Sequence, residues 1–368
     1  MPMVSRLGRC HTGITYYGVS VRRGAAMGDV RQSTRQTNDG HGMLLGDVPS
    51  FRQTDLMTDD HPVRRYDGKD KKRYSAPLRG LVFVVIFIAA AIAVIGVGSG
   101  GSAALPGSGV GVTPDMTLVS WGELFGAIVA YLVVVMAMEG RRLPAELAPM
   151  RALDLVRGGI ASFVCIAVSI GIIALLGGYR IVGFNAGYDP WADLLTLGLT
   201  AGVAEEIMMR GILLRLVEES LGSWGAVAVS ALVFGLLHVT NPDGTLWGGI
   251  AIAIEAGLLF GAIYLATRSL WWCIGFHAMW NIAEGPIFGS IVSGTGAQQS
   301  WLVAQWNGPE LLTGGSFGLE ASIIPVLVLG GLAIAILIHL QRHGRMIAPV
   351  WVRRKLIVAE AVNANAVA

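Results

Sequence analysis

The chain has 368 residues, of which 53% are hydrophobic and only 14% are charged, with a formal net charge of +2. This composition excludes an ordinary soluble domain and is typical of a protein that crosses a membrane several times. The small net charge gives no support for nucleic-acid binding. Glycine is abundant, at 50 residues, and small residues let membrane helices approach one another closely.

The N-terminal 76 residues differ from the rest of the chain. They are polar, rich in Gly, Ser, Thr, Arg and Asp, and have no sustained apolar period. We therefore expect residues 1–76 to be a disordered cytoplasmic tail. No short apolar segment follows an early basic start, so no signal peptide is expected. Met27, Met43 and Met57 are alternative start positions.

Eight apolar stretches follow, each long enough, or nearly so, to cross a hydrocarbon core of about 30 Å. The sequence thus predicts an all-α membrane protein, a bundle of about eight transmembrane helices within one domain, residues 77–342. A basic C-terminal tail, residues 343–368, would follow. The predicted spans are 80–98, 118–138, 157–178, 193–214, 223–241, 247–267, 270–292 and 322–341.

Basic residues test this topology. They fall before the first span, in the loop after the second, after the fourth and sixth, and after the last, whereas the opposite loops hold only Arg180. Lys and Arg accumulate on the cytoplasmic side of membrane proteins. The pattern therefore predicts a multi-pass protein of the plasma membrane with the N- and C-termini both cytoplasmic.

Glu205, Glu206 and Arg210 lie in the middle of the fourth predicted span. A charged side chain at the bilayer centre costs about 2.5–3.5 kcal/mol on insertion scales, so three together indicate a functional or structural need. Glu206 and Arg210 are four residues apart and share a helix face, where they can form an ion pair. Glu205 points about 100° away from that pair. It therefore has no local partner, as suits a reactive carboxylate.

Two histidines lie well inside predicted spans. His238 ends the run Phe234-Gly-Leu-Leu-His238, and His277 begins the run His277-Ala-Met-Trp-Asn281. A spacing of four puts Phe234 beside the His238 ring, where it can hold the imidazole or simply pack. The same spacing puts His277 and Asn281 on one face, as two donors for an oxyanion or as members of an interhelical hydrogen-bond network.

Together these side chains fill the roles needed to hydrolyse an amide without a covalent intermediate. Glu205 and His238 can activate a water, because a low-dielectric site favours proton uptake by a carboxylate near neutral pH. His277 and Asn281 can stabilise the tetrahedral intermediate. Glu206 and Arg210 can hold the helix that carries Glu205.

Three motifs in this order resemble those of a known family. Glu205-Glu206-Ile-Met-Met-Arg210 matches EExxxR, while Phe234 to His238 matches FxxxH and His277 to Asn281 matches HxxxN. The segment 190–292 is similar to CPBP proteins, which include type II CAAX prenyl endopeptidases and Abi-type bacterial proteases. The resemblance implies an eight-helix intramembrane endopeptidase that acts on a peptide or prenylated protein substrate within the lipid bilayer. It also implies that Glu205, His238, His277 and Asn281 are catalytic, with Glu206 and Arg210 supporting them.

Alternatives remain open at this point. Glu205, His238 and His277 could instead bind zinc with an open fourth position, although water activation with no required cofactor is favoured. The chain could also be a non-enzymatic immunity or partner-binding protein, or, less in keeping with its lack of paired broken helices, a transporter. Straight helices with the predicted bounds would leave Glu205, His238 and His277 at different depths, which is a difficulty for any shared site.

Overall fold

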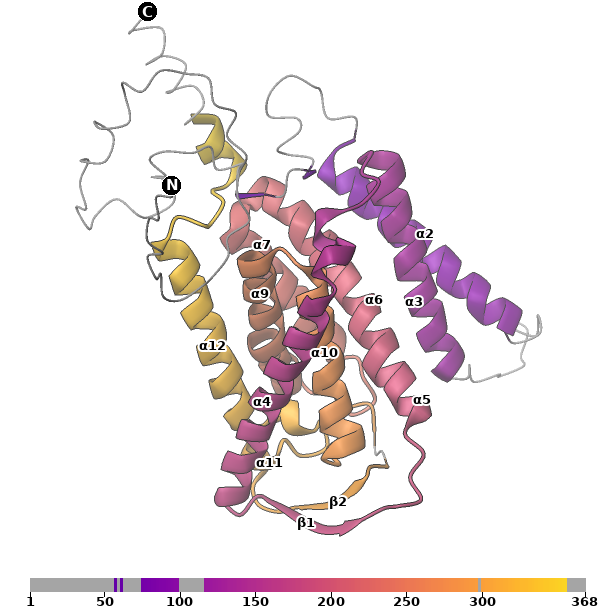
Figure 1. The fold of residues 1–368 in the computed structure, drawn as a ribbon, viewed down its shortest axis with the longest axis vertical. Coiled ribbons are helices and arrows are strands. Elements are labelled where there is room, and N and C mark those ends of the chain that lie inside the picture. The colour runs from indigo at the N-terminus through magenta and orange to yellow at the C-terminus, as the bar shows by residue number, and fades with distance from the viewer. Residues whose placement is uncertain (1–55, 58–59, 62–73, 99–115, 297–298, 356–368) are drawn as a thin grey trace, which may run out of the picture. The chain divides into compact units, whose positions relative to one another are not determined.

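The computed structural model describes residues 56–57, 60–61, 74–98, 116–296 and 299–355. The predicted N-terminal tail, the connection after the first span and the last residues of the C-terminal tail lie mostly outside these ranges. Within them the chain is mainly helical (Figure 1). The principal helical segments are α2 (Ala76–Gly98), α3 (Met116–Leu132) with its π-helical extension Val133–Met138, α4 (Leu153–Leu175), α5 (Trp191–Asp193), α6 (Gly202–Glu206), α7 (Arg215–His238), α8 (Leu246–Ile252), α9 (Leu259–Thr267), α10 (Leu270–Ile282) and α12 (Ile323–Arg342).

Six helices among the described residues are long and apolar enough to cross a membrane. Each of the eight predicted spans overlaps a helical segment, but two of them, 193–214 and 223–241, belong to one continuous helical run from Trp191 to His238. A third, 270–292, corresponds to α10 and is not among the six. It carries polar side chains in an otherwise apolar run, which lowers its mean hydropathy. The protein is thus a membrane protein, and a count of eight crossings stays a prediction.

A bend at Gly222 divides the long helical run into two arms. Gly222 has φ 71° and ψ −178°, a backbone conformation that is essentially restricted to glycine. Its carbon α also lies against the chain near Ile347, so close that a Cβ would come within 2.5 Å of the Ile347 carbonyl oxygen. The first arm therefore continues to Leu221, seven residues beyond the end predicted from hydropathy, before the chain turns back.

Glycines also set the closest helix contacts. A Cβ on Gly158 of α4 would lie 2.2 Å from the Trp272 carbonyl oxygen, and one on Gly275 of α10 would lie 2.0 Å from the Leu155 carbonyl oxygen. Neither position can hold a larger residue without moving backbone, so α4 and α10 lie side by side at glycine contacts. This contact helps to fix α10, which carries two of the predicted site residues.

A short sheet was not predicted. β1 (Tyr179–Phe184) pairs antiparallel with β2 (Leu302–Trp306), and the register shifts between Ile181 and Gly183. Both segments lie between predicted spans and were expected to be loops. Two strands this short give a weak periodic signal, and their partners are more than 100 residues apart, so only the tertiary fold specifies the pairing. The sheet ties the end of α4 to the segment between α10 and α12 (Figure 1).

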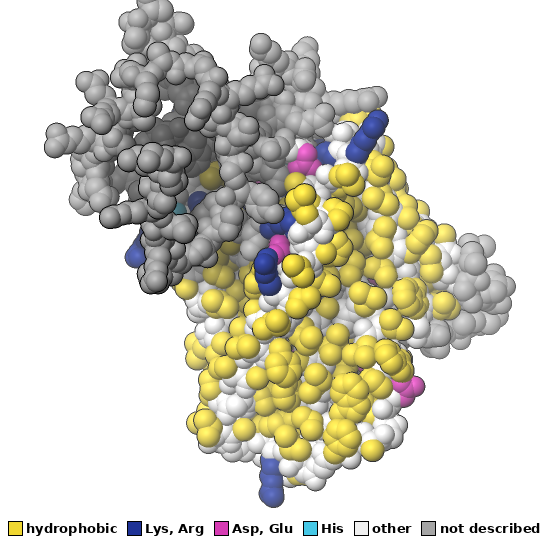
Figure 2. All heavy atoms as spheres, in the orientation of Figure 1, with side chains coloured by type: hydrophobic (Ala, Val, Ile, Leu, Met, Phe, Trp, Pro, Cys, Tyr) yellow, Lys and Arg dark blue, Asp and Glu magenta, His cyan; other side chains and the backbone are white. Residues whose placement is uncertain are grey.

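Hydrophobic side chains cover most of the described surface that faces the viewer, and charged side chains lie near its ends (Figure 2). The exposed hydrophobic residues include Leu81, Val85 and Ile92 of α2 and Ile160 and Val164 of α4. An apolar exterior of this kind fits the acyl chains of a bilayer rather than water. The lipid bilayer predicted as a partner thus has a matching surface.

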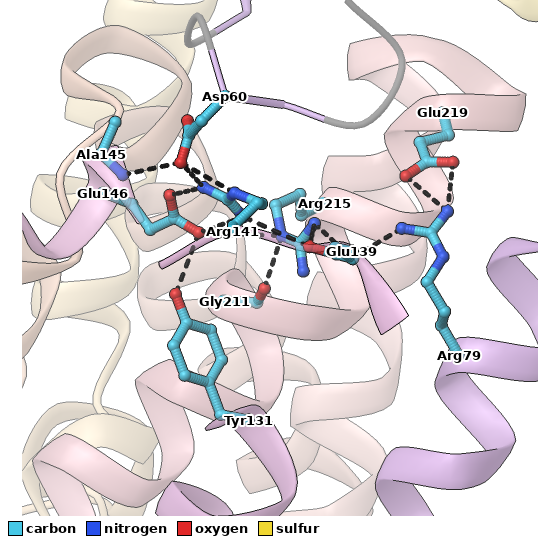
Figure 3. A network of polar contacts seen from close by, with 10 residues as sticks. All are labelled: Asp60, Arg79, Tyr131, Glu139, Arg141, Ala145, Glu146, Gly211, Arg215 and Glu219. Atoms are coloured by element: carbon cyan, nitrogen blue, oxygen red, sulfur yellow. Dashed lines mark hydrogen bonds and ion pairs between the residues drawn. The ribbon is translucent and has the colours of Figure 1, made fainter. Parts of the chain in front are cut away.

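Basic residues from several parts of the chain meet at one end of the bundle (Figure 3). Glu139 accepts hydrogen bonds from Arg79 at 2.6 Å and from Arg215 at 2.8 Å, and Glu219 accepts one from Arg79 at 2.6 Å. Arg141 pairs with Glu146 in the same region. These arginines are 2% exposed or less, so they form a buried ion network rather than surface anchors. Arg79, Arg141 and Arg215 thus lie at the same end of the bundle, as predicted from the positions of the basic residues in the sequence. That this end faces the cytoplasm stays a prediction.

The bundle continues past the predicted boundary at residue 342. Among the residues buried there are Met346, Ile347 and Ala348. The backbone N–H of Ser223 donates to the Ile347 carbonyl oxygen at 2.9 Å, and the backbone N–H of Ile347 donates to Ser223 Oγ at 2.9 Å. Residues 350–355 are helical. The first part of the predicted C-terminal tail therefore packs against the Gly222 bend. At the other end of the chain, Met57 is 3% exposed and packs against Ile347, although it was assigned to the disordered tail.

Candidate active site

Glu206 and Arg210 form the predicted ion pair. Arg210 donates to Glu206 Oε1 at 2.8 Å, and both side chains are fully buried. The guanidinium carbon lies 4.9 Å from the ring centres of Phe234 and Phe260, a sandwich that stabilises a desolvated cation. Arg210 also donates to the Ala256 carbonyl oxygen. The pair thus connects α6 with α7 and with the segment that precedes α9.

Glu206 also positions His277. The distance from His277 Nδ1 to Glu206 Oε1 is 2.9 Å. An ionised carboxylate only accepts hydrogen bonds, so Nδ1 carries the proton. Gly202 and Gly198 make this approach possible, because a Cβ on Gly202 would lie 3.0 Å from the Ala278 backbone nitrogen. The glycine face of the Glu205 helix therefore brings its carboxylates against α10.

His238 is held in a different way. Its Nδ1 lies 2.7 Å from the Phe234 carbonyl oxygen, and a carbonyl oxygen also only accepts. The proton is therefore on Nδ1, and Nε2 of the neutral ring keeps a lone pair. The Phe234 ring packs edge-on against this imidazole, with 4.6 Å between ring centres. The predicted packing of Phe234 beside His238 is present.

Glu205 faces both histidines. Its Oε2 lies 4.0 Å from His238 Nε2 and 3.9 Å from His277 Nε2. The same oxygen is buried and has no hydrogen-bond partner among the described residues. These separations are too long for a hydrogen bond and suit a bridging water. The structure thus brings together three of the four predicted catalytic side chains around one point.

The expected mismatch in depth between Glu205 and His238 is absent. Glu205 lies 17 residues before Gly222 and His238 lies 16 residues after it. At 1.5 Å per residue, the two are about 24–26 Å from the bend, each measured along its own arm. The expectation was wrong because it ended the first arm at Leu214. Charged residues that resemble a loop, Arg215, Glu218 and Glu219, are instead buried helix.

Asn281, the fourth predicted catalytic residue, is 5% exposed. Its Nδ2 donates to the Leu197 carbonyl oxygen at 2.9 Å. A primary amide has two N–H groups, so one remains for a ligand. Leu197 lies in a π-helical segment, Leu194–Ala201, where the altered hydrogen-bond spacing frees a carbonyl oxygen.

A pocket with about 320 Å³ of space between atoms, part of it open to solvent, lies beside these groups, although Glu205 does not line it. Both histidines, Phe234 and Asn281 line it together with apolar and acidic side chains. The lining residues are Phe234, His238, Ile252, Glu255, Ala256, Phe260, Phe276, His277, Trp280, Asn281, Ser293, Glu320 and Leu329. A mainly apolar wall with a few convergent polar groups is typical of a ligand or active site.

Three acidic residues near the site had no assigned role. They are Glu255, Glu320 and Glu123. Glu123 of α3 lies close enough to Glu205 to interact with it electrostatically. Its place inside an apolar span was a usable signal. Glu320 had no such signal, because it lies in a polar segment far from the motifs.

The zinc alternative can be compared with the donor geometry. Both Nε2 atoms face Glu205, and each Nδ1 is held by an acceptor, as is usual for histidines that bind a metal. However, no group of three His, Cys, Asp or Glu side chains within the described ranges is arranged to hold a metal ion. The described residues therefore do not form a three-ligand site in this arrangement. Whether the protein binds zinc stays a question for metal analysis.

Comparison with known proteins agrees with the motifs. No curated protein sequence matches the chain. A family model described as Type II CAAX prenyl endopeptidase Rce1-like matches residues 187–283, a segment that contains all three motifs. As the motifs predicted, residues 187–283 are therefore similar to the Rce1-like type II CAAX prenyl endopeptidases, and this segment lies within a mostly helical membrane protein.

Proposed function

We propose that this protein is an intramembrane endopeptidase that hydrolyses peptide bonds of membrane-associated substrates with a water held between Glu205 and His238. The observation that carries the proposal is the convergence of Glu205 Oε2 and two imidazole Nε2 atoms at 3.9–4.0 Å. The family match supports the reaction class.

The hydrogen bonds of the two histidines give them different roles. Glu205 Oε2 and His238 Nε2 are both acceptors, so one water can donate a hydrogen bond to each and direct its own lone pair at a carbonyl carbon. His277 already donates through Nδ1 to Glu206. It can donate through Nε2 as well only as an imidazolium, which the carboxylates of Glu205 and Glu206 stabilise.

Hydrolysis then proceeds in two steps. The water oxygen bonds to the carbonyl carbon while one of its protons moves to Glu205, and the C=O double bond becomes a C–O⁻ single bond. The His277 imidazolium and the second Asn281 N–H stabilise this oxyanion. As the C–N bond breaks, an acid in the site gives its proton to the leaving nitrogen and the C=O bond re-forms; the proton on Glu205 then replaces the one that was given up. No covalent enzyme intermediate and no cofactor are required.

The family match and the apolar surroundings of the site support a class of substrate. An apolar exterior and a buried site suit substrates that enter from the bilayer, such as prenylated CAAX-type proteins or leader peptides. Both termini of the enzyme would lie in the cytoplasm, in the plasma membrane, as the distribution of basic residues indicates.

A reconstituted assay tests this proposal. The full chain in lipid vesicles is incubated with an internally quenched, farnesylated peptide ending in a CAAX sequence, and with the same peptide lacking the farnesyl group. Glu205→Gln should lower cleavage by about 10²–10⁴-fold without loss of thermal stability. Glu310→Gln, at an exposed position away from the site, is the matched control and should cleave normally.

Other outcomes distinguish the alternatives. Loss of cleavage on chelation, with about one zinc per chain by metal analysis, would establish the metalloprotease instead. Full activity of Glu205→Gln would remove the water-activation role. If the wild type cleaves neither peptide, comparison of membrane peptides from cells carrying wild type or Glu205→Gln searches for another substrate. The absence of any difference there would favour the partner-binding alternative.

A further inference from the structure

Glu255 is an unpartnered acid in the wall of the catalytic cavity. The residue is 1% exposed, and neither carboxyl oxygen has a hydrogen-bond partner among the described residues. It lines the same cavity as His238 and His277. A buried ionised carboxylate without a hydrogen-bond donor costs several kcal/mol. A carboxyl group at this cost is expected to have a role. Neither the ion pairs nor the water-activating residues already account for such a role of Glu255.

Two further carboxyl groups stand next to it. Glu320 is 4% exposed and accepts a hydrogen bond of 2.6 Å from Ser293 Oγ, while Glu284 is fully buried and accepts one of 3.4 Å from Ser290 Oγ. The carboxyl groups of Glu255, Glu284 and Glu320 are close enough to interact electrostatically. They come from three separate segments, so the fold assembles the cluster.

Among the described residues, no lysine or arginine forms an ion pair with these acids. The ionisable groups that face them from neighbouring elements are His238 at the end of α7, His277 on α10, and Arg210 beyond the cavity wall. Arg210 pairs with Glu206 and donates to the Ala256 and Gly257 carbonyl oxygens. Like charges in a low-dielectric site cannot all be ionised, so the three carboxyl groups share at least one proton at neutral pH.

Glu320 lies outside the membrane-spanning segments. Burial raises the pKa of Glu320, against the lowering effect of the hydrogen bond from Ser293. His238 and His277 line the same cavity as Glu320. A proton on the cluster can be drawn toward the site where the peptide bond breaks.

We propose that Glu255, Glu284 and Glu320 form a protonated carboxyl cluster that donates the proton taken up by the leaving nitrogen, with Glu255 as the group exposed to the cavity. This inference rests on the proposed endopeptidase function and adds the general acid to it. As the C–N bond breaks, the O–H bond of the cluster breaks and an N–H bond forms, so the cluster becomes anionic. The proton that Glu205 took from the attacking water then returns through cavity water and restores the cluster.

Protonation of the cluster can be measured without any substrate. Infrared difference spectra of the reconstituted chain at neutral pH should contain the C=O stretch of a buried, protonated carboxyl group. Glu255→Gln should remove intensity from this band, whereas Glu310→Gln should leave it unchanged. A cluster that is fully ionised at neutral pH, with no such band in the wild type, would overturn the proposal.

The kinetic test uses the farnesylated quenched peptide. Glu255→Gln keeps the size and neutrality of the side chain, so folding should be retained. The substitution should lower kcat by about 10²-fold with little change in KM. In the wild type kcat should also fall at high pH as the cluster loses its proton, and this decline should be absent in Glu255→Gln. A packing role alone would not alter the pH profile.

Two further variants make the result decisive. Glu255→Asp retains an acid and should recover part of kcat, and Glu320→Gln should shift the high-pH decline because it removes the neighbouring charge. If Glu205→Gln abolishes cleavage while Glu255→Gln and Glu320→Gln both retain the wild-type rate and pH profile, the donor cluster is wrong and the endopeptidase function stands. If Glu205→Gln retains full activity, the water-activating role of Glu205 fails, and if the wild type cleaves no substrate, the proposed function itself fails.

Discussion

The difference between His238 and His277 arises from a single hydrogen bond on each ring. Phe234 offers a neutral carbonyl oxygen to His238, whereas Glu206 offers a carboxylate to His277. A neutral acceptor leaves a ring neutral with a free lone pair, and an anionic acceptor favours the imidazolium. In the proposed mechanism, two chemically identical side chains thus act as a hydrogen-bond acceptor and as a hydrogen-bond donor.

Substitution of Glu206 tests this difference. Glu206→Gln should reduce cleavage by about 10²-fold, because His277 loses the charge that supports its donor role. It should also destabilise the protein by about 3–5 kcal/mol, because Arg210 is left as an unpaired buried cation. Both effects can be followed with the quenched-peptide assay and thermal unfolding of the reconstituted chain.

The double variant Glu206→Gln, Arg210→Met separates the two effects. Methionine can fill the space between the Phe234 and Phe260 rings without a charge, so stability should largely return. Cleavage should stay low because His277 still lacks its carboxylate. Recovery of cleavage together with stability would show that Glu206 acts only by holding the fold.

At the scale of elements, the position of the Gly222 bend determines whether Glu205 and His238, which lie on the two arms of one helical run, come next to each other. The bend is fixed by a left-handed glycine and by the chain around Ile347, which lies against it. Any change in the position of the turn would slide one arm along the other by about 1.5 Å per residue. Catalytic geometry tolerates less than that.

Gly222→Ala should therefore impair both stability and activity. The new methyl group would meet the Ile347 carbonyl oxygen at 2.5 Å, in a backbone conformation that costs a non-glycine residue about 1–3 kcal/mol. Gly171→Ala on α4 is the control, because a Cβ there meets nothing within 4 Å and alanine favours a helix. Thermal unfolding and cleavage should fall for the first variant and be unchanged or improved for the second. Equal behaviour of the two would remove the bend from the explanation of the site.

At the scale of the whole molecule, the sequence predicted the helical membrane class and the motif residues well. Periodic spacing and buried charge are local signals, and both are strong in 190–292. The continuation of the fourth segment through Arg215 and Glu219 was missed, because charged residues resemble a loop until their partners are known. Glu139 and Arg79 are those partners, and they lie far away in the sequence. Glu320 was missed for the same reason.

The buried ion network makes a further prediction, about stability and pH. Burial alone would raise the pKa of Glu139, but Arg215, Arg79 and Arg141 surround it and hold its pKa below the ordinary value of 4.5. A carboxyl group whose pKa is lowered by folding stabilises the folded state fully above its unfolded value, and this contribution is lost as the pH falls through the lowered value. Unfolding of the reconstituted chain should therefore become easier as the pH falls below about 4.5.

Glu139→Gln identifies the group responsible. It leaves Arg79 and Arg215 without the carboxylate that both contact, at 2.6 Å and 2.8 Å, and should cost about 3–5 kcal/mol at neutral pH. The loss of stability on acidification should also be smaller in the variant, because one titrating group has been removed. Denaturant unfolding of wild type and variant at several pH values measures both. If acidification weakens the two proteins equally, Glu139 does not carry the pH dependence, and another carboxylate at this end of the bundle, such as Glu146 or Glu219, becomes the group to replace.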